Sequence, residues 1–358
     1  MNAQNLKVTT IHTLDDKLIK EWKALWTHAE NANLYNSYDW YLTSKATTNT
    51  KNYIFYVCYQ GSKLVALLPM EEYKVFGFPV LGSINKSYII ETGFLLETYD
   101  KTLFQVFFGR LLENKNIYLQ KIDSKAATIL HELFPKAFIH IMSVNPILPM
   151  TDDPLSNASP STISQIKRLL RKNEDHIEYK AYTDNLEKHF DTMLNLQKYT
   201  SKHIKSMDIF EHEIHQRYYR NLTKFCAKNV KIIFLYFDKK PIGYIYNVFW
   251  NKYVLGEQIA FHNDYRKISP GKLMIYILVE YLKKNNFKIL DMGGGITPYK
   301  MSFTNEYRLL YNVYISSNMF AMTWWKTITF VRRMKQILLP KKFSRDHEFL
   351  FDPFVKKR

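Results

Sequence analysis

The sequence predicts a mixed α/β (α+β) chain that contains two copies of one module. A β-hairpin pattern occurs twice, with strands over 53–59 and 64–70 and again over 232–237 and 242–250. Aligning Lys63 with Pro241 places the two hairpins about half the chain apart. A segment rich in Pro, Asp, Asn and Ser lies between the halves. We therefore predict two modules in tandem, each with a mixed, mostly antiparallel sheet flanked by helices.

The proline-rich segment over 145–161 sets the predicted domain boundaries. The predicted domains are an N-terminal module over 1–150, a C-terminal module over 151–316 and a basic amphipathic tail over 317–358. Apolar residues at helical spacing predict helices before each hairpin, and a run of apolar residues predicts a further strand in each half. The ranges are helices over 15–30, 102–114, 162–173, 184–207 and 210–229, a helix that starts near Asn36, and strands over 88–96 and 253–261.

The chain is basic, with 358 residues, 50 Lys and Arg against 33 Asp and Glu, and a net charge of +17. Such a charge predicts an anionic partner, namely a nucleotide cofactor, a nucleic acid or an acidic lipid surface, and does not choose among them. Cys58 and Cys226 lie in apolar patterns, which favours buried thiols in a reducing cytosol over a disulfide or metal pair. No signal-peptide pattern and no apolar run of membrane-spanning length occurs, so we expect a cytoplasmic protein.

The stretch over 261–303 holds the first group of candidate site residues. Ser269 suits a helix N-cap, Pro270 suits the first helical position, and Gly271 permits close approach of a ligand to the backbone. The helix ends at Asn285 and Asn286. A helix N-terminus attracts anions, and basic residues surround this one, which predicts a phosphate seat; an ordinary helix start on a basic surface explains it equally well. The basic residues are Arg266, Lys267 and Lys272.

A glycine-rich turn follows the next predicted strand. Asp291 ends that strand, and the turn then leads to Tyr299 and Lys300. The glycines permit a sharp turn and close approach of a ligand, although their spacing matches neither a dinucleotide fingerprint nor a Walker loop. Lys300 could bind a carrier phosphate or stabilise an oxyanion, Tyr299 could stack on a ring or donate a hydrogen bond, and Asp291 could fix the turn or Lys300. The glycines are Gly293, Gly294 and Gly295.

The order of these motifs resembles the C-terminal half of bacterial tandem-GNAT acyltransferases. The matching residues are Tyr265-Arg266, Ser269-Pro270-Gly271, the run from Asp291 to Gly295, and Tyr299-Lys300 followed by Phe303. The resemblance is to the group associated with cellulose biosynthesis (CelD/BcsL-like), which is related to the Fem peptidyltransferases. It covers roughly residues 160–310, with a weaker similarity from Trp22 to Leu81.

The resemblance implies direct transfer of an acyl group from a carrier to an amine. The implied carrier is acyl-CoA, with acetyl-CoA as the usual donor, and the acceptor would be an amine on a sugar or on an envelope or polysaccharide precursor. Glu257 and His262 are the candidate bases, while a salt-bridged edge glutamate and a loop histidine are the structural alternatives. No nucleophile triad and no metal-ligand spacing is visible, so we expect neither a covalent acyl-enzyme nor a metal.

Two departures keep other functions open. The carrier turn from Arg266 to Lys272 lacks the two spaced glycines that are typical of acetyl-CoA loops, and the Fem relatives use aminoacyl-tRNA instead, so tRNA remains an alternative donor. The tail interleaves apolar residues with Lys and Arg, which predicts either packing on its own domain or peripheral membrane contact through 317–342. A non-catalytic basic module that binds RNA or membrane is the third reading.

Overall fold

The computed structural model describes residues 3–48, 52–75, 77–85, 87–113, 115–204, 208–316 and 318–338. The chain divides into two units, of which unit 1 comprises Met1–Val144 and Leu309–Arg358, and unit 2 comprises Asn145–Arg308. The first division thus lies at 145 rather than at the predicted 151. The last part of the chain, from Leu309 on, falls with unit 1, whereas we predicted a boundary at 317.

Unit 1 is a mostly antiparallel sheet flanked by helices. Its strands lie in the order β1-β2-β3-β4-β6-β13, all antiparallel neighbours except the parallel pair β4 and β6. The strands are β1 (Leu6–Ile11), β2 (Ile54–Gln60), β3 (Lys63–Val75), β4 (Phe78–Ser83), β6 (Ile117–Asp123) and β13 (Tyr307–Ile315), and β5 (Leu95–Leu96) pairs with β3. The helices are α1 (Asp16–His28), α2 (Tyr38–Thr48), α3 (Lys101–Leu112), α4 (Ser124–Leu133) and α11 (Met319–Leu338).

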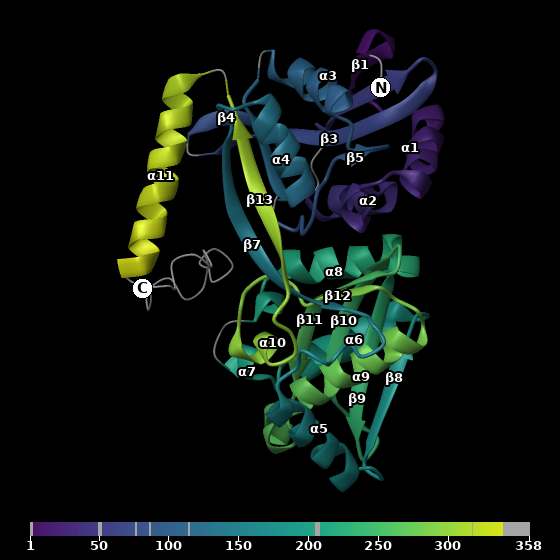
Figure 1. Cartoon of the computed structure of the whole chain (residues 1–358). Coiled ribbons are helices and arrows are strands. Elements are labelled where there is room, and N and C mark those ends of the chain that lie inside the picture. Colours follow the sequence, from purple (N-terminus) through teal and green to yellow (C-terminus); the bar gives the residue numbers. More distant parts are fainter. Residues whose placement is uncertain are drawn as a thin grey trace. The chain divides into compact units, whose positions relative to one another are not determined.

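Unit 2 repeats this order of elements (Figure 1). Its strands lie in the order β12-β11-β10-β9-β8, again antiparallel except for one parallel pair, β11 and β12. They are β8 (Ile177–Tyr182), β9 (Val230–Phe237), β10 (Lys240–Trp250), β11 (Tyr253–Phe261) and β12 (Ile289–Asp291). The helices are α5 (Pro160–Lys172), α6 (Leu186–Gln197), α7 (Ser201–Ile204), α8 (Glu213–Phe225), α9 (Pro270–Lys284) and α10 (Pro298–Met301).

The two units share one chain order. Unit 1 runs β1-α1-α2-β2-β3-β4-α3-β6, with the short β5 inserted before α3, and unit 2 runs β8-α6-α8-β9-β10-β11-α9-β12, with the short α7 inserted after α6. Both runs begin with a strand that pairs with the hairpin and end with a parallel pair across one helix. This correspondence confirms the predicted tandem of two α/β modules.

Three sequence predictions were wrong in extent. The helix that we predicted over 184–207 is two helices, α6 and α7, with a break over 198–200. We predicted that the linker begins at residue 145, but 145–149 is the end of strand β7 (Phe138–Pro149), which pairs with β12 through Ile147, Leu148 and Pro149. The prolines of a strand end were taken for a linker. We also predicted a strand over 88–96, of which only Leu95–Leu96 is a strand.

Each unit has its own apolar core. In unit 1, α3 and α4 pack their buried faces on the sheet through residues such as Phe104, Phe107 and Leu130. In unit 2, α9 is the central helix, and Leu273, Ile277 and Leu278 contact the apolar face of β10, β11 and β12. The burial of these side chains fixes α9, and so it fixes the turn before it and the strand end beside it.

Candidate active site

Helix α9 begins at a turn whose backbone differs from the expected cap. Ser269 is at the N-cap position and Pro270 is in the first turn, as predicted, but the Ser269 side chain makes no capping hydrogen bond. Its backbone is left-handed, with φ 51° and ψ 55°. Glycine adopts this conformation most readily. Acetyl-CoA loops typically have two spaced glycines, which this turn lacks in sequence. At Ser269 the backbone nevertheless has a conformation that a glycine would adopt.

The basic residues of this turn point in different directions. The Lys272 ammonium donates to Gln165 Oε1 (2.9 Å) and Thr162 Oγ1 (3.4 Å), so it joins α9 to α5. Arg266 and Lys267, in the 3-10 turn Asn263–Ile268, are exposed to solvent. Arg266 and Lys267 are therefore the cations of this turn that remain available to an anionic ligand.

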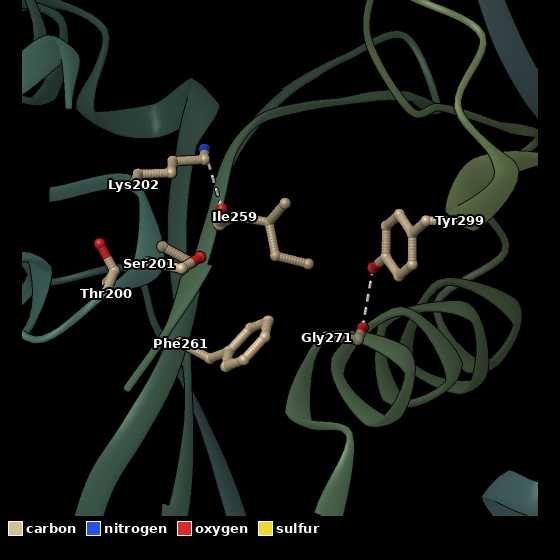
Figure 2. Close-up of a pocket in the computed structure, with 8 residues that line it drawn as sticks. Thr200, Ser201, Lys202, Ile259, Phe261, Gly271 and Tyr299 are labelled. Carbon is tan, nitrogen blue, oxygen red and sulfur yellow. Dashed lines mark hydrogen bonds between the residues drawn. The ribbon is translucent and has the colours of Figure 1, made fainter. Parts of the chain in front are cut away.

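A cavity of about 140 Å³ opens beside the first turn of α9 (Figure 2). Most of its lining is apolar. Ile259 lies between Lys202 and Tyr299 in this view. The lining residues are Thr200, Ser201 and Lys202 at α7, Ile259, Ala260 and Phe261 of β11, Gly271 of α9 and Tyr299 of α10.

The cavity lies where two parallel strands stop pairing. β11 pairs with β12 only from Tyr253 to Leu255, although β11 continues to Phe261. The cavity is lined by that continuing part of β11 and by Tyr299, which follows β12 in the chain. A strand edge that loses its neighbour can accept an extended ligand.

Tyr299 and Lys202 supply polar groups to this apolar cavity. The Tyr299 hydroxyl donates to the Gly271 carbonyl (2.8 Å), and burial raises the pKa of Tyr299, which keeps the phenol protonated. The Lys202 ammonium donates to the Ile259 carbonyl (3.2 Å), and burial lowers the pKa of Lys202, a shift that the charge of Asp208 opposes. Both groups are donors beside the space that a ligand would fill.

The glycine turn is held by Asp291 and Lys300 together. Asp291 is 1% exposed, and its carboxylate accepts from the Gly293 N–H (2.7 Å). The Lys300 ammonium donates to the carbonyls of Gly293 (3.0 Å) and Gly294 (2.6 Å). Gly293 has φ 75°, and a Cβ there would lie 3.3 Å from the Gly256 carbonyl. The turn therefore packs directly on β11, one residue before Glu257.

Glu257 is the extra residue of a β-bulge. Gly256 pairs with Asn247 and Gln258 pairs with Tyr246, so the register between β10 and β11 shifts at Glu257. Its carboxylate accepts from the Tyr219 hydroxyl (3.2 Å), which also accepts from the Gln258 amide (3.0 Å). Bulges often direct a side chain toward an active site.

His262 occupies a separate place at the end of β11. It is 7% exposed, its Nδ1 accepts from the Asp264 N–H (3.3 Å), and its ring stacks on Tyr199 at 4.8 Å. These contacts make it a cap for the following 3-10 turn. The structure thus groups Tyr299 with Gly271, Lys300 and Asp291 with the glycine turn, and Glu257 with Tyr219, each within unit 2.

Sequence reasoning missed Lys202, Ser201 and Thr200. They follow α6 in a short polar segment that carries no motif. The bridge between Thr200 and His262 brings this segment to β11. Only a prediction of that long-range pairing would have placed Lys202 in the site. Within the described ranges, no cluster of three or more His, Cys, Asp or Glu side chains is arranged to hold a metal ion.

Several solved structures share this fold. One is described as FemX, with a TM-score of 0.63 and 11% identity over 86% of this chain and 97% of that chain. A conserved protein of unknown function from Bacteroides thetaiotaomicron VPI-5482 gives a TM-score of 0.53 and 12% identity over 86% and 100%. The C-terminal domain of a putative lysylphosphatidylglycerol synthetase from Agrobacterium fabrum gives 0.52 and 10% over 74% and 84%. At these identities the likeness concerns the fold alone.

The search of curated proteins found no match. Residues 160–301 match the family described as the acetyltransferase (GNAT) domain. The match begins at the first residue of α5 and ends at the last residue of α10, so it includes the cavity, the glycine turn and Glu257. The segment 160–301 is therefore similar to a GNAT acetyltransferase domain, and it is the part of the chain that holds the candidate active site.

Proposed function

We propose that the domain transfers an acyl group from an acyl-CoA, with acetyl-CoA as the first candidate, to an amine. The observation that carries this proposal is the apolar cavity of about 140 Å³ beside the start of α9. A thin thioester arm would fit an apolar slot along the part of β11 that does not pair with β12. Its phosphates would then reach the helix start, where Arg266 and Lys267 are exposed.

The reaction needs no covalent enzyme intermediate. The acceptor nitrogen forms a bond to the thioester carbonyl carbon, the carbon–sulfur bond breaks, and the thiolate leaves. Glu257 takes one proton of the incoming ammonium before the attack, and the protonated Tyr299 phenol supplies a proton to the thiolate. The nitrogen loses a second proton as the amide forms, and that proton restores the Tyr299 phenol. An ammonium has three donors, so Lys202 can bond both the Ile259 carbonyl and the developing oxyanion.

Lys300 has a positioning role in this proposal. Its ammonium bonds two carbonyls of the glycine turn, so it fixes the turn against β11 beside Glu257. From the sequence we expected Lys300 to contact the oxyanion or a carrier phosphate. Its positioning role requires neither contact. His262 caps the turn that carries Arg266 and Lys267.

The acceptor that we propose is an amine on a sugar or on a cell-envelope or polysaccharide precursor. This choice rests on the motif resemblance to the CelD/BcsL-like group. A second donor is supported by a different observation, because the fold of FemX matches over 97% of its length and the chain carries a charge of +17. That donor is an aminoacyl-tRNA, which a basic surface attracts.

Coenzyme A is expected to raise the thermal midpoint of the wild-type protein by several degrees. A ligand at about one hundred times its dissociation constant adds roughly 2.7 kcal/mol to native stability. The double variant Arg266→Gln/Lys267→Gln should lose most of that rise, because it removes the exposed cations of the turn. The measurement is a thermal-shift titration near physiological salt.

The matched control is Lys284→Gln, since Lys284 is exposed in the last turn of the same helix. It should keep the full rise. If coenzyme A raises the thermal midpoint equally in both variants, Arg266 and Lys267 do not bind its phosphates. No rise with CoA, together with protection by charged tRNA, would favour the aminoacyl-tRNA donor. Salt-sensitive RNA binding without preference for the charged end, and no transfer activity, would favour the non-catalytic reading.

Lys202→Met is expected to slow transfer at least tenfold without lowering the thermal midpoint at pH 7. Burial lowers the pKa of Lys202 below its ordinary value of 10.5, so the charged side chain costs stability at pH values below its folded pKa. That cost is relieved as pH rises toward 10.5, and any stability advantage of the methionine variant should shrink over the same range. Thermal unfolding at pH 7 and pH 10 and the transfer rate test both statements.

Lys188→Met is the control for this experiment, because Lys188 is exposed on α6. It should change neither the rate nor the pH dependence of stability. A Lys202→Met protein that transfers acyl groups at the wild-type rate would remove Lys202 from the proposed site.

A further inference from the structure

Helix α11 presents apolar side chains on two faces. One face is buried against the sheet of unit 1, where Trp325 is 2% exposed and its ring stacks on Tyr314 at 3.3 Å and 8°. Met322 and Val80 belong to the same apolar cluster. The inner face therefore packs on unit 1, and Phe320 near the start of the helix also contacts Phe78, with the ring centroids 6.1 Å apart.

The outer face is apolar as well, and it faces solvent. Phe320, Trp324 and Val331 recur at intervals of four and seven residues, which places them on one stripe of the helix. Met334 continues the stripe, and Met319 and Phe330 lie at its border. Their exposed fractions are Met319 73%, Phe320 71%, Trp324 44%, Phe330 63%, Val331 43% and Met334 38%. An apolar stripe of this size on a folded helix indicates a binding surface.

The charge of the helix indicates what kind of surface it meets. The sequence of α11 contains four basic residues and no Asp or Glu. Lys326, between Trp324 and Phe330, is exposed. A helix that combines exposed Trp and Phe with Lys and Arg, and that lacks acidic residues, is suited to the interface of an anionic bilayer. A second copy of this helix would instead bring like charges together.

We propose that the outer face of α11 docks the protein on an anionic lipid surface. The helix lies in the plane of the interface, with the stripe from Phe320 to Met334 in the acyl boundary and the Lys326 ammonium at the headgroups. None of the described helices is long and apolar enough to cross a bilayer. The proposal does not depend on the donor or acceptor of the acyl transfer.

The test is co-flotation of the full chain with vesicles of phosphatidylglycerol and phosphatidylcholine in equal parts. The wild type should float with these vesicles and much less with pure phosphatidylcholine. Trp324→Gln/Phe330→Gln/Val331→Gln should reduce binding about a hundredfold, and Lys326→Glu at least about fivefold. All substituted side chains are exposed, so the thermal midpoints should stay at the wild-type value.

A matched triple variant carries the same chemistry on unit 2, where Tyr179, Ile214 and Tyr307 are 47%, 38% and 47% exposed. Replacing these three by Gln should leave flotation unchanged. The proposal is overturned if the wild type does not float with anionic vesicles, or if the α11 variants float as well as the wild type. A wild-type dimer that the α11 triple variant converts to a monomer would assign the stripe to a second copy instead. If the triple variant does not fold, Lys326→Glu alone decides.

Discussion

Asp291→Ala is expected to lower the unfolding free energy of unit 2 by about 3 kcal/mol and to abolish transfer. The carboxylate is almost fully buried and accepts from the Asn145 amide (3.0 and 3.1 Å), the Tyr253 hydroxyl (2.6 Å) and the Gly293 N–H (2.7 Å). Arg308 lies 4.0 Å away. Alanine removes the acceptor that these donors share, which costs about 1 to 3 kcal/mol for each donor that water cannot reach.

The measurement is thermal unfolding, in which a loss of about 3 kcal/mol lowers the midpoint by roughly 6 to 12 °C in a unit of this size. Asp291→Asn keeps the shape but loses the charge, and it should give a smaller loss. Asp152→Ala is the control, since Asp152 is exposed in the same unit. Equal midpoints for Asp291→Ala and Asp152→Ala would show that this network does not stabilise the glycine turn.

The sequence alone predicted the parts of the site that local rules determine. Pro270 at the helix start and the glycine turn after β12 are local signals, because each restricts the backbone at its own position. The hairpins could be predicted equally well, since a turn between two segments of alternating apolar and polar residues needs no distant partner. The structure bears out those elements.

The rest depends on pairings between distant segments. Nothing near Glu257 in the sequence shows that it lies in a bulge, because the bulge is defined by the register with β10. Lys202 enters the site only through the bridge from Thr200 to His262. The segment 145–149 was taken for a linker because proline is rare inside a sheet and this segment contains Pro146 and Pro149. The segment is nevertheless a strand end that pairs with β12. Register and long-range pairing are the information that composition and periodicity lack.

Glu257→Gln is expected to lower the transfer rate by about a hundredfold to ten-thousandfold while the protein stays folded. Burial, with the charge of Glu257 as a second cause, raises the pKa of Tyr219 well above its usual value, so Tyr219 stays protonated and donates to Glu257. A glutamine oxygen accepts the same hydrogen bond, which preserves the bulge. The amide cannot take a proton from an ammonium, and proton transfer by a positioned base contributes a factor of this size.

The assay is steady-state acyl transfer to a panel of amines across pH. Without a base, the variant depends on amine that is already deprotonated in solution, so its deficit should shrink as the pH rises toward the pKa of the acceptor amine. Glu280→Gln is the matched control, because Glu280 is an exposed glutamate on α9. A purely structural Glu257 would change the thermal midpoint and leave the pH profile intact. If transfer survives both Glu257→Gln and Lys300→Ala at the wild-type rate, the base and the glycine turn lie outside the reacting centre, and the search moves to Lys202 and His262.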